Sequence, residues 1–376
     1  MINRKRMLDE FFELVQITCT SGKEREVADL VKQRLEDLGL EVTEDKAGEK
    51  IGGNTGNILG YLKGTAAGAP VIMLSAHLDS VEPCSGVKPQ LKDGVITSAG
   101  DTILGSDDKA GVASILEALR IVTEKQIPHG DVQVVFTVQE ESGLCGSKNI
   151  DREWIKADFA YALDSSGEPG KIIIKAPGEN TIKVTVKGKT AHAGIAPEEG
   201  INAIVVAGKA LAQLKQGRLD EETTANVGII KGGQATNVVP DRVEIVCEAR
   251  SHNMDKLQKV TQDMKATFER VAQENGAKAE VEIIEDFVAY ALKEDSQPVA
   301  LAVKAAASIN LKPQLEATGG GSDANVFNSF GIPTAVMGMG MSKVHTTEEY
   351  IKEEELYQGA ELAVALIKAA AETNKA

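Results

Sequence analysis

Residue types that bind divalent metals follow several apolar segments of this sequence. His77 and Asp79 come directly after the run VIMLSA, and Glu140 and Glu141 come one residue after the run VQVVFTV. Three further candidates follow other segments of the chain: Asp107, Asp164 and His345. Zinc accepts imidazole nitrogen and carboxylate oxygen, and catalytic zinc sites keep one position open for water. These residue types therefore favour a metal-dependent hydrolytic site.

A group of acids gathered at one place in a protein needs a cation. A single acid at the end of a strand is usually a cap or a solvated charge, but buried carboxylates are costly unless they are paired or bind a cation. Two divalent ions about 3.5 to 4 Å apart would remove the repulsion among several acids. Two imidazoles and three carboxylates are enough for two ions if one acid bridges them: His77, Asp107, Glu141, Asp164 and His345.

Two acids remain beside these candidate ligands, and each has a role that such a site requires. A metal-bound histidine needs an acceptor at its other ring nitrogen, and Asp79 lies two residues after His77, on the same side of an extended chain. Glu140 directly precedes Glu141, so their side chains diverge, and one can bind metal while the other faces the water. We therefore predict Glu140 to be the general base, worth about 10²- to 10⁴-fold in rate.

The elements that must position these residues alternate between strands and helices. The apolar runs VIMLSA, VQVVFTV and FAYALD predict strands, and the apolar spacing over 27–38 and 112–122 predicts helices. A further helix from about Gln297, a strand at PTAVMG and a C-terminal helix over 352–372 continue this pattern. Alternating strands and helices indicate an α/β fold with a mixed, largely parallel sheet, whose ligand crevice lies beyond the carboxyl ends of the strands.

The middle of the chain has a different order of elements. From Thr181 the pattern reads strand, helix, strand, strand, helix, strand, which is the ferredoxin-like order. We therefore expect a discontinuous catalytic domain, made of residues 1–177 and 293–376, and an inserted α+β lid domain over residues 178–292.

Composition excludes several other functions. A formal net charge of −15 without a Lys/Arg cluster argues against nucleic acid as a partner, and no apolar run is long enough for a membrane helix. The N-terminal segment has acids among its apolar positions and no cleavage site, which favours a cytoplasmic location. The four cysteines are scattered without a CxxC pair, so free thiols are expected. The sequence lacks the spacings of a phosphate loop, a dinucleotide fold and a serine-hydrolase elbow.

Eight motifs resemble a known family, the dinuclear zinc exopeptidases and deacylases of the peptidase T, dipeptidase V and glutamate carboxypeptidase type. They run from residue 75 to residue 350 in the family's order: SAHLDSVEP, LGSDDKAGVA, VQEESGLCGS, YALDSSG, GKTAHAG, GGQATNVVPD, GGGSDANVF and KVHTTEEY.

The resemblance implies a role for each candidate ligand. One zinc would be held by His77, Asp107 and Asp164, and the other by Asp107, Glu141 and His345. It also implies that Glu140 is the general base, and that a cis peptide bond joins Asp107 to Asp108.

The resemblance extends to the middle segment. His192 in TAHAG matches a histidine that in many relatives reaches the active site of the partner subunit and stabilises the oxyanion, which implies a homodimer through the lid. Asn237 and Arg250 match residues that contact the substrate, although a salt-bridged strand arginine is an equally good interpretation of Arg250. The glycine-rich loop with Gly320 and Gly321 matches the loop that lines the substrate pocket.

The residue type at Asp164 indicates which activity within the family this chain resembles. Relatives that release N-terminal residues or dipeptides have aspartate there, whereas carboxypeptidase and desuccinylase branches usually have glutamate. The resemblance is closest to peptidase T-like tripeptide aminopeptidases. It implies that a water molecule activated by zinc attacks a short peptide. Cobalt and manganese also suit these ligands. The alternative function is that of a zinc-dependent deacylase, or of a dipeptidase or carboxypeptidase, acting on N-acyl amino acids or small peptides. A third possibility is a binding protein without catalysis.

Overall fold

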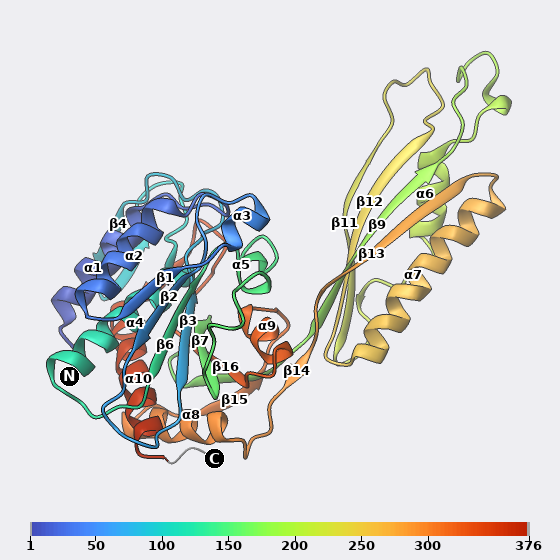
Figure 1. The fold of residues 1–376 in the computed structure, drawn as a ribbon. Coiled ribbons are helices and arrows are strands. Elements are labelled where there is room, and N and C mark those ends of the chain that lie inside the picture. Colours follow the sequence, from blue (N-terminus) through green and yellow to red (C-terminus); the bar gives the residue numbers. More distant parts are fainter. Residues whose placement is uncertain (1, 374–376) are drawn as a thin grey trace. The chain divides into compact units, whose positions relative to one another are not determined.

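The chain folds into two compact units in a computed structural model, which describes residues 2–373 (Figure 1). The first unit comprises the residues up to Ile174, residues 291–317 and the residues from Ser322 onward. The second unit comprises residues 175–290 and residues 318–321. The divisions thus lie two or three residues before the expected ones, and the short segment 318–321 belongs to the second unit, which the sequence pattern did not indicate.

A mixed sheet forms the centre of the first unit. Its strand order is β1-β2-β6-β3-β7-β16-β8-β14, and β15 also pairs with β8. The four central strands β6, β3, β7 and β16 are parallel, whereas β1, β2 and β8 pair antiparallel. The bounds are β1 (Glu41–Glu44), β2 (Ile58–Leu62), β3 (Ile72–His77), β6 (Val132–Thr137), β7 (Phe159–Ser165), β8 (Lys171–Ala176), β14 (Tyr290–Ala291), β15 (Gln314–Ala317) and β16 (Thr334–Gly338). An α/β fold with a mixed sheet is confirmed, but only its centre is parallel, so "largely parallel" was too strong.

The central strands are apolar throughout because both faces of the sheet are covered. On β3, Ile72 and Leu74 belong to the main core, while Met73 points to a second core with Phe327 on the opposite face. Successive side chains of a strand point to opposite faces of the sheet, so a strand that is covered on both faces contributes to two cores.

Helices cover both faces of this sheet. Helix α4 packs on β3 and β7 and is itself covered by α10 and α1. Helices α5 and α9 are in contact with each other, and α9 packs on β16 and β7. The bounds are α1 (Arg4–Gln16), α2 (Arg25–Asp37), α3 (Ala47–Ile51), α4 (Ser106–Glu124), α5 (Cys145–Lys148), α8 (Gln297–Ser308), α9 (Asp323–Ser329) and α10 (Glu353–Ala371). A small sheet of β17 (Tyr350–Lys352), β5 (Val95–Ser98) and β4 (Pro89–Lys92) completes the unit.

The second unit is an antiparallel sheet covered by two helices. Its strand order is β10-β11-β12-β9-β13, and helices α6 and α7 pack on it to enclose a separate apolar core. Asn202 and Asn253 cap these helices, each accepting two backbone N–H groups of the first turn. The bounds are β9 (Gly178–Lys187), α6 (Ala203–Leu211), β10 (Gly217–Arg218), β11 (Thr223–Gly232), β12 (Arg242–Ser251), α7 (Met254–Glu274) and β13 (Lys278–Phe287). Apart from the short β10, this is the predicted β-α-β-β-α-β order.

Two further expectations can be compared with the structure. Across residues 2–373, no helix combines the length and the apolar character needed to cross a bilayer. All four cysteines lie in the described part of the chain and carry free thiols, as the sequence predicted.

Candidate metal centre and active site

The candidate ligands meet at the carboxyl-terminal edge of the parallel strands. His77 is the last residue of β3, Asp164 lies at the end of β7, and Glu141 follows β6. His345 follows β16 after a short loop, and Asp107 lies in the first turn of α4. Four neighbouring strands and one helix start therefore deliver five side chains from across the sequence to one place, as expected for parallel strands.

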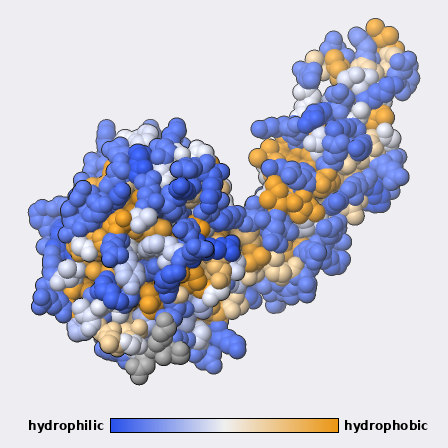
Figure 2. Space-filling model, in the orientation of Figure 1, coloured by the Kyte–Doolittle hydropathy of each residue, from blue (hydrophilic) through white to orange (hydrophobic). Residues whose placement is uncertain are grey.

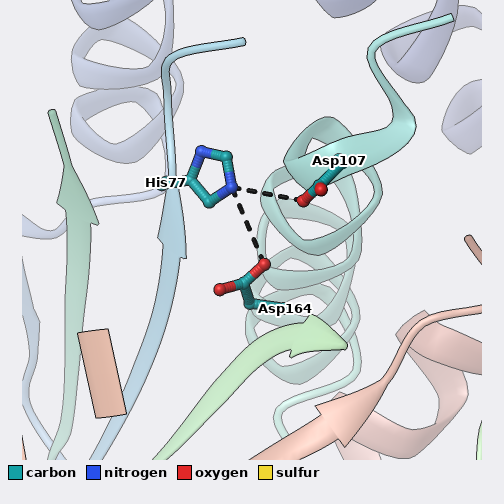
Figure 3. A group of neighbouring side chains, drawn as sticks. All are labelled: His77, Asp107 and Asp164. Atoms are coloured by element: carbon teal, nitrogen blue, oxygen red, sulfur yellow. Dashed lines mark hydrogen bonds and ion pairs between the residues drawn. The ribbon is translucent and has the colours of Figure 1, made fainter. Parts of the chain in front are cut away.

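The first group of ligands consists of His77, Asp107 and Asp164 (Figure 3). The Nε2 atom of His77 lies 3.2 Å from Oδ1 of Asp107 and 3.6 Å from Oδ1 of Asp164. The His77 side chain is buried, while the two aspartates are about one-tenth exposed, at 13% and 11%. The three ligand atoms thus converge at a point that solvent can still reach.

The second group consists of Asp107, Glu141 and His345. The Nε2 atom of His345 lies 2.8 Å from Oε1 of Glu141 and 3.3 Å from Oδ2 of Asp107. His345 has a left-handed backbone with φ of 63°, and its side chain is half exposed. This group is therefore the more open of the two.

These separations fit two metal ions with Asp107 between them. In each group all three ligand atoms lie within 4.8 Å of one another, whereas ligands placed about 2.1 Å from a tetrahedral ion would be separated by roughly 3.4 Å. Asp107 uses Oδ1 toward His77 and Oδ2 toward His345. One carboxylate oxygen thus faces each group, which is the arrangement that a bridging ligand requires.

The charges of the group favour cation binding. Burial and neighbouring carboxylates raise the pKa values of Glu140 and Asp164 well above their usual range. Burial opposes ionisation of Asp107 as well, but hydrogen bonds with His345 and His77 lower its pKa overall. Hydrogen bonds with Asp107 and Glu141 raise the pKa of His345 to about 10. The protein alone therefore retains protons at this site, and a divalent ion would displace them.

Asp79 has a wider role than the one predicted, because it contacts both the ring of His77 and the backbone of the acid pair. The Nδ1 atom of His77 lies 3.0 Å from the backbone oxygen of Asp79 but 3.5 Å from its carboxylate. A carbonyl oxygen only accepts, so Nδ1 carries the hydrogen and Nε2 turns its lone pair toward the acids. The Asp79 carboxylate also accepts hydrogen bonds from the backbone N–H groups of Glu140 and Glu141 and from the hydroxyl of Ser21. Asp79 thus fixes the backbone of the acid pair as well as the ring of His77.

Sequence reasoning missed several buried acids behind these ligands. Asp108, joined to Asp107 by a cis peptide bond, accepts from the backbone N–H groups of His77 and Gly111. Asp323 accepts from the hydroxyls of Thr137 and Ser147. Asp108 and Asp323 lie inside the motifs LGSDDKAGVA and GGGSDANVF, so their position in the sequence was the available signal.

Two further acids bind the loops that carry the ligands. Glu24 accepts from the backbone N–H groups of Gly22 and Gln139, the residue before Glu140. Glu349 accepts four hydrogen bonds from residues 104–107. The motif KVHTTEEY contains Glu349 four residues after His345, whereas nothing in the sequence near Glu24 indicated a role.

The remaining candidates all lie in the second unit. His192 is exposed and forms an isolated β-bridge with Val238, and the N–H of Ala193 donates to the oxygen of Asn237, so the two candidate segments are neighbours. Arg250 lies on β12, with ion pairs of 3.2 Å to Glu179 and 3.3 Å to Glu248.

The glycine-rich loop is held close to β13. The N–H of Gly320 donates to the hydroxyl of Thr318. A side chain at Gly321 would clash with the ring of Phe287, because an added Cβ would lie 2.2 Å from it. Glycine at this position therefore permits the close approach of the loop.

Comparisons with known proteins agree with this geometry. A family model described as "Peptidase family M20/M25/M40" matches residues 73–369. The chain is 45% identical to the uncharacterized protein YqjE of Bacillus subtilis, over 99% of this chain and 100% of that one. A crystal structure of aminopeptidase PepT from Bacillus cereus is similar, with a TM-score of 0.91, 45% identity and coverage of 98% and 99% of the two chains. A tripeptidase structure from Staphylococcus aureus has a TM-score of 0.95 and 41% identity, and covers 99% and 100%. The chain belongs to peptidase family M20/M25/M40 and is a peptidase.

Proposed function

We propose that this peptidase is a dinuclear-zinc aminopeptidase that releases N-terminal residues from tripeptides and other short peptides. The observation that carries the proposal is the position of Asp107, whose two oxygens face two separate groups of ligands. The similar solved structures described as an aminopeptidase and a tripeptidase support the choice of reaction.

The proposed reaction assigns a step to each part of the site. His77, Asp107 and Asp164 would hold one ion, and Asp107, Glu141 and His345 the other. Bound ions would lower the pKa of a water molecule toward about 7 and polarise the carbonyl of the scissile bond. Glu140 takes the proton of the attacking water and returns it to the leaving amine as the C–N bond breaks. Asp79 holds the backbone of Glu140 in place for both transfers.

The second unit would serve as an inserted lid domain. We propose that His192 stabilises the oxyanion and that Asn237 contacts the backbone of the substrate. The loop with Gly320 and Gly321 would line the pocket. Arg250 already pairs with two carboxylates, so a substrate carboxylate would have to compete with both of them.

A panel of capped peptides separates the aminopeptidase from its alternatives. The zinc-loaded protein is expected to hydrolyse trialanine and its C-terminal amide, and to release the first residue. We expect kcat/KM to be at least about 10²-fold lower for the N-acetylated tripeptide, because a site built for a free amine leaves polar groups unpaired when the amine is blocked. Mass spectrometry of the products identifies the bond that is cleaved.

Each alternative predicts a different result from the same panel. A deacylase would cleave the acetyl group and ignore the free peptide, and a carboxypeptidase would lose activity on the C-terminal amide. A dipeptidase would prefer dialanine, assayed beside the panel, to trialanine. A binding protein without catalysis would hydrolyse none of these peptides after zinc is restored, which would contradict the proposal.

The proposal includes a homodimer formed through the second unit. Apolar side chains are exposed on α6 and β11, and Figure 2 shows hydrophobic residues gathered around β11. Their exposed fractions are 43% for Ile204, 51% for Val205, 47% for Ile229 and 52% for Ile230. Within the described chain, residues 226–232 of β11 pair with β12 alone. A second copy would cover these apolar side chains and extend the sheet at its open edge.

Charge introduced at this edge of the sheet is expected to separate the dimer. Ile230→Glu would place a carboxylate in the interface without disturbing the core, because the side chain is half exposed. Sedimentation velocity should show a dimer for the unchanged protein and a monomer for the variant. The control is Leu91→Glu, which changes an exposed apolar residue, 39% accessible, of the first unit and should remain dimeric. A monomeric unchanged protein, or a dimer that survives Ile230→Glu, would rule out this interface.

A further inference from the structure

Glu349 is a buried carboxylate with four hydrogen-bond donors around it. Its side chain is 2% exposed. Oε2 accepts from the backbone N–H groups of Leu104, at 2.9 Å, and Gly105, at 2.8 Å. Oε1 accepts from the hydroxyl of Ser106, at 2.6 Å, and from the N–H of Asp107, at 3.1 Å. Four consecutive residues that end at the candidate bridging ligand therefore wrap around one side chain.

The same carboxylate belongs to the loop that carries His345. Glu349 follows His345 by four residues, and its own N–H donates to the oxygen of Thr346, which closes the turn between them. The contacts of its carboxylate, with partners 242 to 245 residues away in the sequence, thus tie the backbone of Asp107 to the loop that carries His345. At the metal site itself the two segments also meet through the side chains of Asp107 and His345.

The two groups of ligands depend on this tie to different degrees. His77 and Asp164 lie on neighbouring strands β3 and β7, whose backbones are paired in the sheet. Asp107 and His345 both lie outside strands, and His345 is half exposed. One of three ligands in the first group, but two of three in the second, therefore depend on Glu349 for their position.

We propose that Glu349 is a positioning residue that sets the affinity of the Asp107, Glu141 and His345 group for its metal ion. This inference rests on the proposed two-ion site, and it adds a residue that controls one ion more than the other. Partners that orient metal ligands typically change affinity by about 10- to 100-fold when they are removed. The ion held with His77 and Asp164 should depend on Glu349 much less.

Glu349→Gln tests this inference with little change in volume. An amide has one acceptor oxygen, so its NH₂ group would face two of the four donors and could accept a hydrogen bond from neither. Titration of the metal-free protein with Zn²⁺ in a calorimeter should give two binding steps for the unchanged chain. In the variant, we expect the dissociation constant of one step to rise by about 10- to 100-fold while the other changes much less, and excess Zn²⁺ to restore kcat without a change in KM.

Matched variants separate positioning from general loss of structure. Glu348→Gln changes the neighbouring acid, which is exposed and paired with Lys343, and should bind both ions normally. Ser106→Ala removes one of the four donors and should weaken the same step to a smaller extent, so it also tests the inference if Glu349→Gln does not fold. The role of Glu349 would be overturned if Glu349→Gln weakened both binding steps equally. It would also be overturned if Glu349→Gln and Ser106→Ala both bound zinc as the unchanged protein does. Absence of zinc binding by the unchanged protein would instead refute the proposed two-ion function.

Discussion

Replacing Glu140 with glutamine is expected to lower kcat by about 10²- to 10⁴-fold while both ions stay bound. The amide keeps the shape of the side chain but cannot take a proton from water. The ligands in both groups are unchanged, so metal content should stay at two ions per chain, and KM for a tripeptide should change little. Steady-state kinetics together with metal analysis by mass spectrometry measures both quantities on one sample.

Two other glutamates provide the comparison for Glu140. Glu141→Gln alters the adjacent acid and should lose the ion shared with His345, so activity and metal content would fall together. Glu153→Gln changes an exposed acid and should match the unchanged protein. Near-normal turnover in Glu140→Gln, or loss of metal with turnover, would refute its assignment as the base.

Asp107→Asn is expected to have the broadest effect of any single change at the site. Both groups lose a charged oxygen at once, because Asp107 faces His77 with Oδ1 and His345 with Oδ2. The loss of Lewis-acid stabilisation, several kcal/mol, corresponds to about 10³-fold or more in kcat/KM. Zinc should also lose its effect on stability, which for a ligand at 100 times its dissociation constant is about 2.7 kcal/mol. Thermal unfolding with and without zinc measures this loss.

The control for Asp107 is a nearby aspartate that faces solvent. Asp101→Asn removes one negative charge six residues earlier, at an exposed position, and should keep both the zinc-dependent rise in melting temperature and the activity. If Asp107→Asn kept one ion at normal affinity, the carboxylate would not be a bridge, and the two groups would be independent sites.

The ligand set could be predicted because it depends on simple geometry. Parallel strands end at one edge, so His77 after VIMLSA and Asp164 after FAYAL had to lie near each other once both segments were strands. The same argument brings Glu141 after VQVVFTV to this edge. For His345 the strand PTAVMG gave the approximate place, and the resemblance to a known family gave the role.

The residues behind the ligands could not be predicted in the same way. Asp79 was expected to hold His77 through its carboxylate, but the backbone oxygen lies closer and the carboxylate serves Glu140 and Glu141. Which atom makes a contact depends on the turn after β3, and the two-residue spacing does not specify that turn. Glu349 binds backbone groups of residues more than 240 positions away, so no local pattern in the sequence reports its partners.

The exact domain boundaries and the strand directions could not be predicted, because they also depend on contacts between residues far apart in the sequence. The segment 318–321 is local in sequence to α9 but packs with the second unit, where Gly321 lies against Phe287. The predicted strands of the first unit are the four parallel strands of the centre, whereas β1, β2 and β8, which pair antiparallel, were not among the predictions. Strand direction depends on the path of the connections, so the predicted strands alone did not reveal that antiparallel strands flank them.

Anomalous diffraction at the zinc edge, from crystals of the zinc-loaded protein, tests the two-ion site most directly. The expected map has two peaks about 3.5 to 4 Å apart. One peak should lie within bonding distance of His77 and Asp164, the other within bonding distance of Glu141 and His345, with Asp107 contacting both. A single peak, or zinc bound away from these five side chains, would contradict the account.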